Sequence, residues 1–354
     1  MNFLKWRDSM NPFAPYRAIN TKIYARRKTL LSQKEWEKLA ESRSVTQIIE
    51  FLKKRPGYKE VVNSYKAEEL HRTDLEVILD RYVVKEIERM LHYFSGSYKE
   101  FFKTLLMEYE ISDLLLLSRS ISGYEEIQDI NRFFIHSEHY ALANFNHLVG
   151  CKNLTQFIEA LRGTPYYEVL KTLNQEDTLK QKFHMEMKLY ILFYKQIMEK
   201  AAKLTPTDQK IVSKLVGTKA DLINIQWIYR AIKYYDISPE EILIYSLPVG
   251  NRTTYKKLKA LTYTKSLQEL RGLATKYLAY PVFEEEKDAF LTKRMDKYIY
   301  EYALKMEDNR ENISTSLTYL YILNIEKEDL IALTEGIRYT LPENELKEYL
   351  VHTI

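Results

Sequence analysis

"KADLINIQWIYRAI", residues 219–232, contains one of only four Asp-Leu dipeptides in the sequence. The same dipeptide, again followed by apolar residues, occurs in "ISDLLLLSRSI" and in "KEDLIALTEGIRYTL". The three aspartates are Asp113, Asp221 and Asp329, so their residue numbers increase in two equal steps of 108. A short phrase that returns at a fixed repeat interval indicates that the chain contains an internal repeat.

A second block of sequence follows the same repeat interval. "ILDRYVVKE" (78–86) corresponds to "EMKLYILFY" (186–194) and to "RMDKYIYEY" (294–302). The tyrosines at the matching place, Tyr82, Tyr190 and Tyr298, are again 108 residues apart. Recurring tyrosines of this kind are typical of core or inter-domain packing.

A third block recurs with small shifts in spacing at 44–62, 153–170 and 266–283. Each begins with a residue that favours a helix N-cap and has Gln or Glu three residues later, which is the pattern of a capping box. The pairs are Ser44 and Gln47, Asn153 and Gln156, and Ser266 and Glu269. In the first two blocks a tyrosine follows the helix, at Tyr58 and Tyr166.

These blocks predict an all-α chain of three similar helical domains in tandem, at residues 1–122, 123–236 and 237–354. The sequence has only 9 Gly and 9 Pro in 354 residues, which favours helices joined by short turns. We expect each domain to hold two or three short helices, one long helix such as 73–94, and a shorter pair that ends in the Asp-Leu segment. Asp221 is expected at the first turn of its helix, as a cap.

Composition narrows the function. The formal net charge of +4 is small for this length, which argues against a dedicated nucleic-acid binder. Residues 1–60 nevertheless carry 14 Lys/Arg against 6 Asp/Glu, and residues 301–354 carry 5 against 11. The bland interpretation is ordinary solvated helix faces; the functional one is that the two ends meet partners of different sign. A single cysteine, Cys151, points to a reducing compartment, and no apolar run approaches the roughly 20 residues that span a bilayer.

Motifs for chemistry are scarce. The sequence contains no Gly-rich phosphate loop, nucleophile elbow or paired-cysteine metal motif. The best metal candidate is "FFIHSEHYALANFNHLVG", where His136 and His139 would share one helical face and His147 would lie about 12 Å further along. This spacing is weak evidence for a metal site, and ordinary half-buried histidines are the simpler interpretation. We therefore expect no cofactor, and a structural or coupling protein rather than an enzyme.

The residues resemble a known family, the C subunits of the archaeal and bacterial A/V-type rotary ATPases, which correspond to the d subunits of eukaryotic V-ATPases. The opening "YRAINTKIYARRKTLLSQKEWEKLAESRSVTQIIEFLKKRPGY" (16–58) is similar to the start of that family. "ADLINIQWIYRAIKYYDISPEEI" (220–242) resembles its middle signature, at Asp221, Asn224–Ile225 and Arg230. "EKEDLIALTEGIRYTLPENELKEYL" (326–350) resembles its ending, except that Leu330–Ile331–Ala332 stands where the family often has Asn-Leu-Arg.

The resemblance implies a funnel of three helical domains around a pseudo-threefold axis. Its wide mouth would receive the central rotor shaft, formed by the D and F subunits, and its other face would rest on the membrane proteolipid (c/K) ring. It would lie peripherally on the cytoplasmic face of the membrane and transmit torque without chemistry of its own. The candidate structural and interface positions are Tyr58, Tyr166, Asp113, Asp221, Asp329, Arg230, Arg338, Arg26, Arg27 and Lys28.

Among these positions, Arg26, Arg27 and Lys28 have a specific hypothetical role. The basic N-terminal third is expected to meet lipid headgroups or acidic loops of the ring, so neutralising these three residues should weaken attachment. Two alternatives remain open from the sequence. One is a helical scaffold unrelated to rotary motors; the other is an all-helical metal hydrolase that uses His136, His139 and His147.

Overall fold

The computed structural model describes residues 14–63, 65, 72–123, 127–173, 178–235, 237–283, 290–308 and 312–352. Within these ranges the chain forms helices and their connections, and no residue belongs to a β-strand. The prediction of an all-α chain is therefore confirmed. No helix in the described ranges is long and apolar enough to cross a lipid bilayer.

The long helices follow the repeat interval of the sequence. The first set consists of α5 (Arg72–Leu91), α6 (Gly96–Thr104) and α7 (Met107–Ile121). The residues one repeat interval later form α11 (Thr178–Ala201) and α12 (Pro206–Arg230), and those one interval further form α16 (Leu291–Met306) and α17 (Ser314–Arg338). Each set is a hairpin whose two arms pack against each other.

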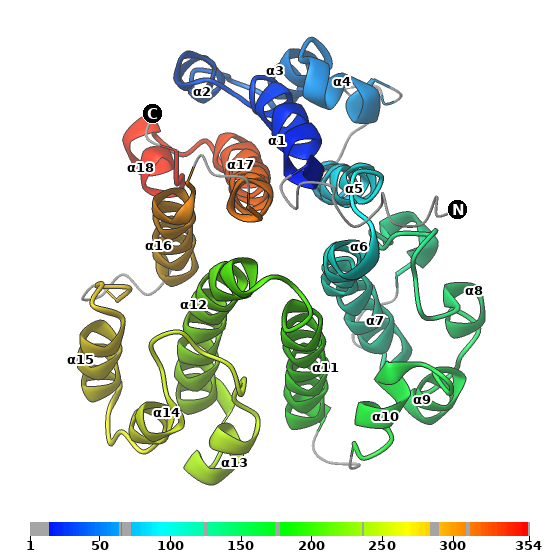
Figure 1. Cartoon of the computed structure of the whole chain (residues 1–354), viewed down its shortest axis with the longest axis vertical. Helices are drawn as coiled ribbons and strands as arrows, with labels where there is room; N and C mark the ends of the chain where they lie inside the picture. The colour runs from blue at the N-terminus through cyan, green and yellow to red at the C-terminus, as the bar shows by residue number, and fades with distance from the viewer. Residues whose placement is uncertain are drawn as a thin grey trace, which may run out of the picture.

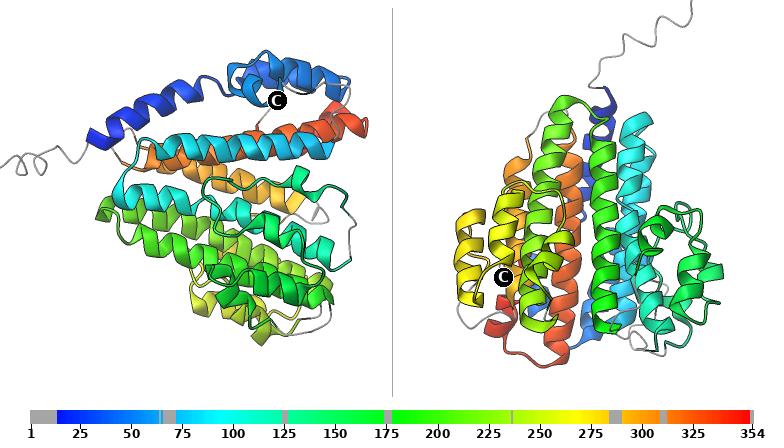
Figure 2. Two further views of the ribbon diagram at one scale, coloured as in Figure 1. Left: turned by 90° about the vertical axis from the view of Figure 1, so that its right-hand side faces the viewer. Right: turned by 90° about the horizontal axis from the view of Figure 1, so that it is seen from below.

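Seen end-on, the long helices stand in a closed ring (Figure 1). Contacts run in order from α5 to α6, α11, α12, α16 and α17. The ring closes because α17, near the end of the chain, packs against α5, near its beginning. The side views show the long helices running side by side (Figure 2). The first and third sets therefore meet through a contact that no chain connection crosses.

Shorter helices lie around the outside of this ring (Figure 1). They are α1 (Ala14–Arg27), α2 (Gln33–Ala40), α3 (Val45–Lys53), α4 (Pro56–Val62), α8 (Phe145–Leu148), α9 (Leu154–Ala160), α10 (Pro165–Leu170), α13 (Pro239–Ile244), α14 (Tyr255–Thr262), α15 (Leu267–Leu278) and α18 (Glu343–Glu348). A 3-10 turn, η1 (Ile130–Phe133), precedes α8, and a π-helical turn, η2 (Ala231–Tyr235), extends α12.

The three predicted N-caps are present, at the starts of α3, α9 and α15. In each, the cap side chain accepts the backbone N–H three residues later; the caps are Ser44, Asn153 and Ser266. The returning side chain differs from an ideal capping box because it bonds the backbone N–H of the residue before the cap. That residue is Arg43, Lys152 or Lys265. The same departure at three places indicates one local structure used three times.

Two expectations about the Asp-Leu segments are wrong. A shorter pair of helices leads to this segment only in the first set, whereas α12 and α17 are each one helix of 25 residues. Asp221 is not a cap. α12 begins at Pro206 behind the N-cap Thr205, whose hydroxyl accepts the N–H of Asp208, so Asp221 lies in the interior of the helix. A start signal of Thr-Pro-x-Asp, present in the sequence, outranks the Asp-Leu phrase.

Candidate functional site

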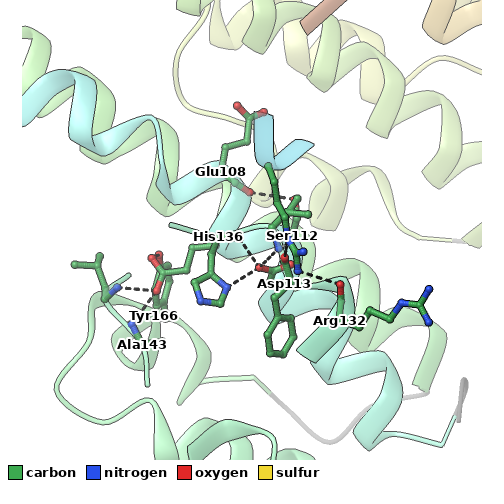
Figure 3. Close-up of polar contacts among 12 residues, drawn as sticks. Glu108, Ser112, Asp113, Arg132, His136, Ala143 and Tyr166 are labelled. Atoms are coloured by element: carbon green, nitrogen blue, oxygen red, sulfur yellow. Dashed lines mark hydrogen bonds and ion pairs between the residues drawn. The ribbon is translucent and has the colours of Figure 1, made fainter. Parts of the chain in front are cut away.

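Asp113 holds the connection that follows its own helix (Figure 3). Its carboxylate is buried in the interior of α7. Oδ2 accepts the backbone N–H groups of Ile135 at 2.9 Å and His136 at 2.8 Å, and lies 2.7 Å from His136 Nδ1. The imidazole of His136 stacks on Phe145 of α8 with ring centroids 3.8 Å apart. One carboxylate therefore ties α7 to the segment that leads into the next short helices.

Asp221 does the same work in the second set. Its side chain is 0% exposed and accepts the backbone N–H groups of Asn251 at 3.1 Å, Arg252 at 2.7 Å and Thr253 at 3.0 Å. The hydroxyl of Thr253 donates to the same carboxylate. Gly250 lies against it so closely that a Cβ there would be 2.5 Å from Asp221 Oδ1, so only glycine fits.

Asp329 completes the series at the end of the chain. Its carboxylate accepts the N–H groups of Val351 at 2.8 Å and His352 at 2.7 Å, and lies 2.8 Å from both His352 Nδ1 and Lys293 Nζ. The ring of His352 stacks on Trp36 of α2, with centroids 4.8 Å apart. The last described loop therefore reaches a short helix from the beginning of the chain.

Glu110 forms a second kind of joint, one turn before Asp113 in α7. Its buried carboxylate accepts the N–H groups of Leu142 at 2.8 Å and Ala143 at 2.7 Å, and the hydroxyl of Tyr166 at 2.9 Å (Figure 3). Tyr166 belongs to α10, so this joint links the first set of long helices to the short helices that follow it.

Glu326 lies two repeat intervals after Glu110. It makes the corresponding joint between the third set of long helices and the beginning of the chain. It is 1% exposed and accepts the N–H of Leu31 at 2.8 Å and the hydroxyl of Tyr58. Tyr58 and Tyr166 are themselves one repeat interval apart. The third set of long helices is thus bonded to the short helices at the start of the chain. The first set is bonded in the same way to the short helices that follow it.

Burial governs the protonation of these groups. It raises the pKa of Asp113, Asp221 and Glu110, against the opposing effect of their hydrogen-bond donors. It raises the pKa of Glu326 further, to about 7. Tyr58 is buried beside Glu326, and both the burial and the neighbouring carboxylate raise its pKa well above the usual range, so its hydroxyl keeps the proton that it donates.

Arg230 and Arg338, also one repeat interval apart, are the last residues of α12 and α17. The helix dipole favours a cation at Arg338, where α17 ends, whereas η2 continues the helical backbone beyond Arg230. Arg230 is half-buried, with Nη1 3.6 Å from Glu186 and Nη2 3.4 Å from the hydroxyl of Tyr235. Arg338 is exposed, and its guanidinium lies 5.9 Å from the ring centroid of Tyr339. Arg338 therefore lies at the surface, whereas Arg230 makes contacts within the chain.

The basic residues at the end of α1 separate in the same way. Arg27 Nη1 is 2.9 Å from Glu307 Oε2, and Arg26 Nη1 is 3.3 Å from Glu86 Oε1. Both arginines are half-buried, whereas Lys28 is exposed. Arg26 and Arg27 thus pair with carboxylates of α5 and of the residue that ends α16, and Lys28 faces solvent.

The space enclosed by the ring of long helices is called the bore here. It is closed at the end where turns join the two arms of each hairpin. Asp208, at the start of α12, accepts the hydroxyl of Tyr16 at 2.5 Å, the hydroxyl of Tyr98, and the N–H of Ile313 at 3.0 Å. These donors come from α1, α6 and the start of α17, so one carboxylate gathers elements from around the bore. Further along the ring interior lies a void of 60 Å³. Its lining is mostly apolar and includes Ile87, Phe193, Ile197, Val216, Leu317 and Leu320, and it shares Glu108 and Lys219 with the larger cavity described next.

The bore is open and polar toward the other end, where α7, α12 and α17 finish. A cavity of 390 Å³ extends there to Gln226 in the penultimate turn of α12 and to Thr292, an exposed residue at the start of α16. Its charged lining consists of Asp80, Glu108, Lys219, Asp296, Lys327 and Glu328. The two ends of the ring therefore differ: one is plugged and the other carries a charged hollow.

The sequence profile of the family described as "ATP synthase (C/AC39) subunit" matches residues 19–349, which is nearly the whole chain. The chain belongs to this family. Among curated relatives, the C subunit of the A-type ATP synthase of Thermococcus kodakarensis is 23% identical, over 96% of this chain and 91% of the relative. The corresponding protein of Thermococcus onnurineus is 25% identical, over 95% and 90%. That of Methanosarcina mazei is 21% identical, over 94% and 91%.

Membership of the C/AC39 family confirms the resemblance read from the sequence and removes the unrelated scaffold. The histidines that the hydrolase alternative requires are not arranged as that alternative predicts. Residues 134–144 are not helical, so His136 and His139 do not share a helical face. In the described ranges no group of three or more His, Cys, Asp or Glu side chains is placed to hold a metal ion. His136 instead bonds Asp113, as described above.

Sequence reasoning missed three partners in this C/AC39 chain. They are Glu110, Glu326 and His352, each tied to a predicted residue through Tyr166, Tyr58 or Asp329. The repeat contains the signal that would have found them. Glu110 and Glu326 are separated by two repeat intervals, and so are His136 and His352. Each histidine follows its aspartate at the same separation in sequence, so the same spacing test identifies the pair.

Proposed function

We propose that this chain is the non-catalytic central-stalk subunit of a V/A-type rotary ATPase. It acts as a socket between the rotor shaft, made of the D and F subunits, and the membrane proteolipid ring. Family membership supports this assignment. The observation that carries it is the closed ring of long helices, because a closed ring with a bore is a shape that can grip a shaft and turn with it.

The ring is composed of three tandem domains, at 1–122, 123–236 and 237–354, around a pseudo-threefold axis. In support, the long helices, the N-caps and the buried carboxylate joints recur at or near the repeat interval. The Glu326 joint to Tyr58 gives the third domain and the first the same bond as the first and second. Two of the three junctions therefore share this carboxylate–tyrosine bond, whereas the second domain has Thr218 at the place of the carboxylate.

The shaft enters at the end where α7, α12 and α17 finish. The charged cavity opens there, and a polar hollow accepts a partner without leaving an apolar patch exposed when the partner is absent. The plugged end, held by Asp208, rests on the proteolipid ring. Torque passes between these ends through stiff helices, and no covalent bond is made or broken.

The basic first helix, α1, contributes to attachment at the membrane proteolipid ring. Arg26 and Arg27 already pair with Glu86 and Glu307, so they support the fold of α1. Lys22 and Lys28 are exposed and are the residues of α1 and its end that would meet lipid headgroups or acidic loops. Lys28→Glu should weaken ring attachment more at low than at high ionic strength, because salt screens such contacts.

The decisive test is reconstitution. A rotary ATPase is stripped of its central-stalk socket and the chain is added back, with ATP hydrolysis and ATP-driven ion transport measured separately. The chain should restore transport in step with hydrolysis, and it should bind both the D–F pair and isolated proteolipid rings. The proposal fails if the chain binds neither partner, or if transport returns equally well without it.

A further inference from the structure

The charged cavity in the bore contains more negative than positive groups. Four carboxyl groups, Asp80, Glu108, Asp296 and Glu328, face two lysines, Lys219 and Lys327. Its side chains come from α5, α7, α11, α12, α16 and α17, so the charges gather at the centre of the ring from every set of long helices.

The two lysines do not satisfy the four acids. Lys219 Nζ is 2.6 Å from Glu108. Lys327 Nζ is shared, at 2.6 Å from Asp80 and 2.9 Å from Glu328. Asp296 has no hydrogen-bond or ion-pair partner among the described side chains that line the cavity. Glu328 is about half exposed, so it still has room for a second cation.

Asp296 is partly withdrawn from bulk water, and the charges of Lys293 and Lys219 offset its desolvation only in part. Its burial, and then repulsion from Glu328, raise its pKa to about 7. A carboxylate that accepts no hydrogen bond in such a place lowers the stability of the chain, because its desolvation is not fully offset. A residue that costs stability in the free chain and faces an open cavity is typical of a site that is completed by a ligand.

We propose that this cavity binds a cationic side chain, lysine or arginine, at the tip of the rotor shaft, between Asp296 and Glu328. The inference rests on the socket function proposed above and names the chemistry that the socket recognises. A volume of 390 Å³ lies near the lower end of the roughly 300–1,000 Å³ of small-ligand pockets, so the cavity accepts side chains rather than a whole helix. An ammonium or guanidinium group supplies the donors that Asp296 lacks.

The test compares binding of the purified D–F pair to the full chain and to three variants at several salt concentrations. The variants are Asp296→Asn, the double variant Asp296→Asn with Glu328→Gln, and the control Glu345→Gln. Glu345 is an exposed carboxylate of α18 that does not line the cavity, and its variant makes the same change in charge as the first. The melting temperature of each chain is measured without the shaft.

Asp296→Asn should weaken shaft binding by at least about tenfold and make it less sensitive to salt, and the double variant should weaken it further. The melting temperature of Asp296→Asn alone should stay level or rise, since a charge that is only partly compensated is removed. Glu345→Gln should bind like the unmodified chain. Unchanged affinity and salt dependence for Asp296→Asn would overturn the cavity proposal alone, and so would a lower melting temperature. If the unmodified chain does not bind the shaft, the socket function falls with it.

Discussion

At the scale of single residues, the repeated aspartates owe their place to backbone donors rather than to helix starts. A buried carboxylate is tolerated when several N–H groups point at it, and each of the three meets at least two such groups. The donors lie in connections, which have no secondary structure to satisfy them. Each aspartate thus replaces the missing partners of a loop and fixes that loop on a long helix.

Asp221→Ala should be strongly destabilising. The change removes the acceptor of three backbone N–H groups and one hydroxyl in a site with no access to water. We expect the free energy of unfolding to fall by about 3 kcal/mol. Urea unfolding followed by circular dichroism measures it.

Asp74→Ala is the matched control, because Asp74 belongs to the one Asp-Leu dipeptide that does not follow the repeat interval. The Asp74 side chain is 9% exposed and pairs with Arg132, whose side chain is 57% exposed. A pair with one largely exposed partner is weaker than three backbone N–H bonds and a hydroxyl bond at a site with no access to water, so we expect a smaller loss, of about 1–2 kcal/mol. Equal losses for the two variants would contradict the anchoring role assigned to the repeated aspartates.

Glu326 predicts a pH dependence of stability. Its pKa is raised by burial from 4.5 to about 7, so the neutral form is favoured in the folded chain. The stability contributed by this neutral form is fully present below about pH 4.5 and is lost as the pH rises through 7. The shift corresponds to about 3 kcal/mol.

Glu326→Gln, which stays neutral, should remove this component. The difference in unfolding free energy between the variant and the unmodified chain should therefore move in favour of the variant from pH 5 to pH 8. Urea titrations at both values measure it. Glu345→Gln, at an exposed position, should show no such movement, and parallel profiles for Glu326→Gln and the unmodified chain would rule out the role given to Glu326.

At the scale of elements, the sequence predicted which helices correspond between the repeats better than it predicted where each helix begins and ends. The repeat interval identified the matching long helices, and the three capping residues were located correctly because a cap is a local signal. The Asp-Leu phrase marks matching points inside helices, so it could not say where α12 begins. The joints of Glu110 and Glu326 depend on contacts between segments distant in the chain, which helical periodicity does not report.

Gly217 shows how closely an element can approach a loop. In α12, a Cβ at this position would lie 2.9 Å from the backbone nitrogen of Asn251 and 3.1 Å from the carbonyl carbon of Gly250. Gly217→Ala gains about 1 kcal/mol of helix propensity, yet it should be destabilising overall because the backbone of an anchored loop must move, at a cost of about 1–3 kcal/mol. Urea unfolding decides the sign.

Gly272→Ala in α15 provides the contrast. No atom lies within 4 Å of the Cβ position there, and the residue is exposed. The same substitution should raise the unfolding free energy by about 1 kcal/mol through helix propensity alone. If Gly217→Ala stabilises the chain as much as Gly272→Ala does, the loop is not held against α12 as described.

At the scale of the whole molecule, the order of contacts matters more than the order of the chain. Two of the junctions between successive sets of long helices are crossed by the polypeptide, and the third is held only by side chains and packing. Its contacts include α17 on α5, Glu326 with Tyr58, Arg27 with Glu307, and His352 on Trp36. A torque-bearing ring needs this junction to match the other two in strength.

That requirement can be tested by cutting the chain at one of the two junctions that the polypeptide crosses. A protease site that replaces residues 124–126 allows the chain to be cut at the junction between the first and second sets. The two fragments, one on each side of the inserted site, should stay together on gel filtration. The junction of Glu326 with Tyr58 and that of Glu110 with Tyr166 both still hold them, and neither depends on the cut peptide bond.

In the cut chain, Trp36→Ala should loosen the complex, because it removes the surface on which His352 stacks and leaves a cavity in the core of the junction. The uncut Trp36→Ala chain is the control, since its covalent link keeps the first and second sets adjacent. Separation of the fragments from the otherwise unmodified cut chain would show that the side-chain junction is weaker than the chain-crossed ones. A socket closed so weakly would open under torque, because the load on a ring is limited by its weakest joint.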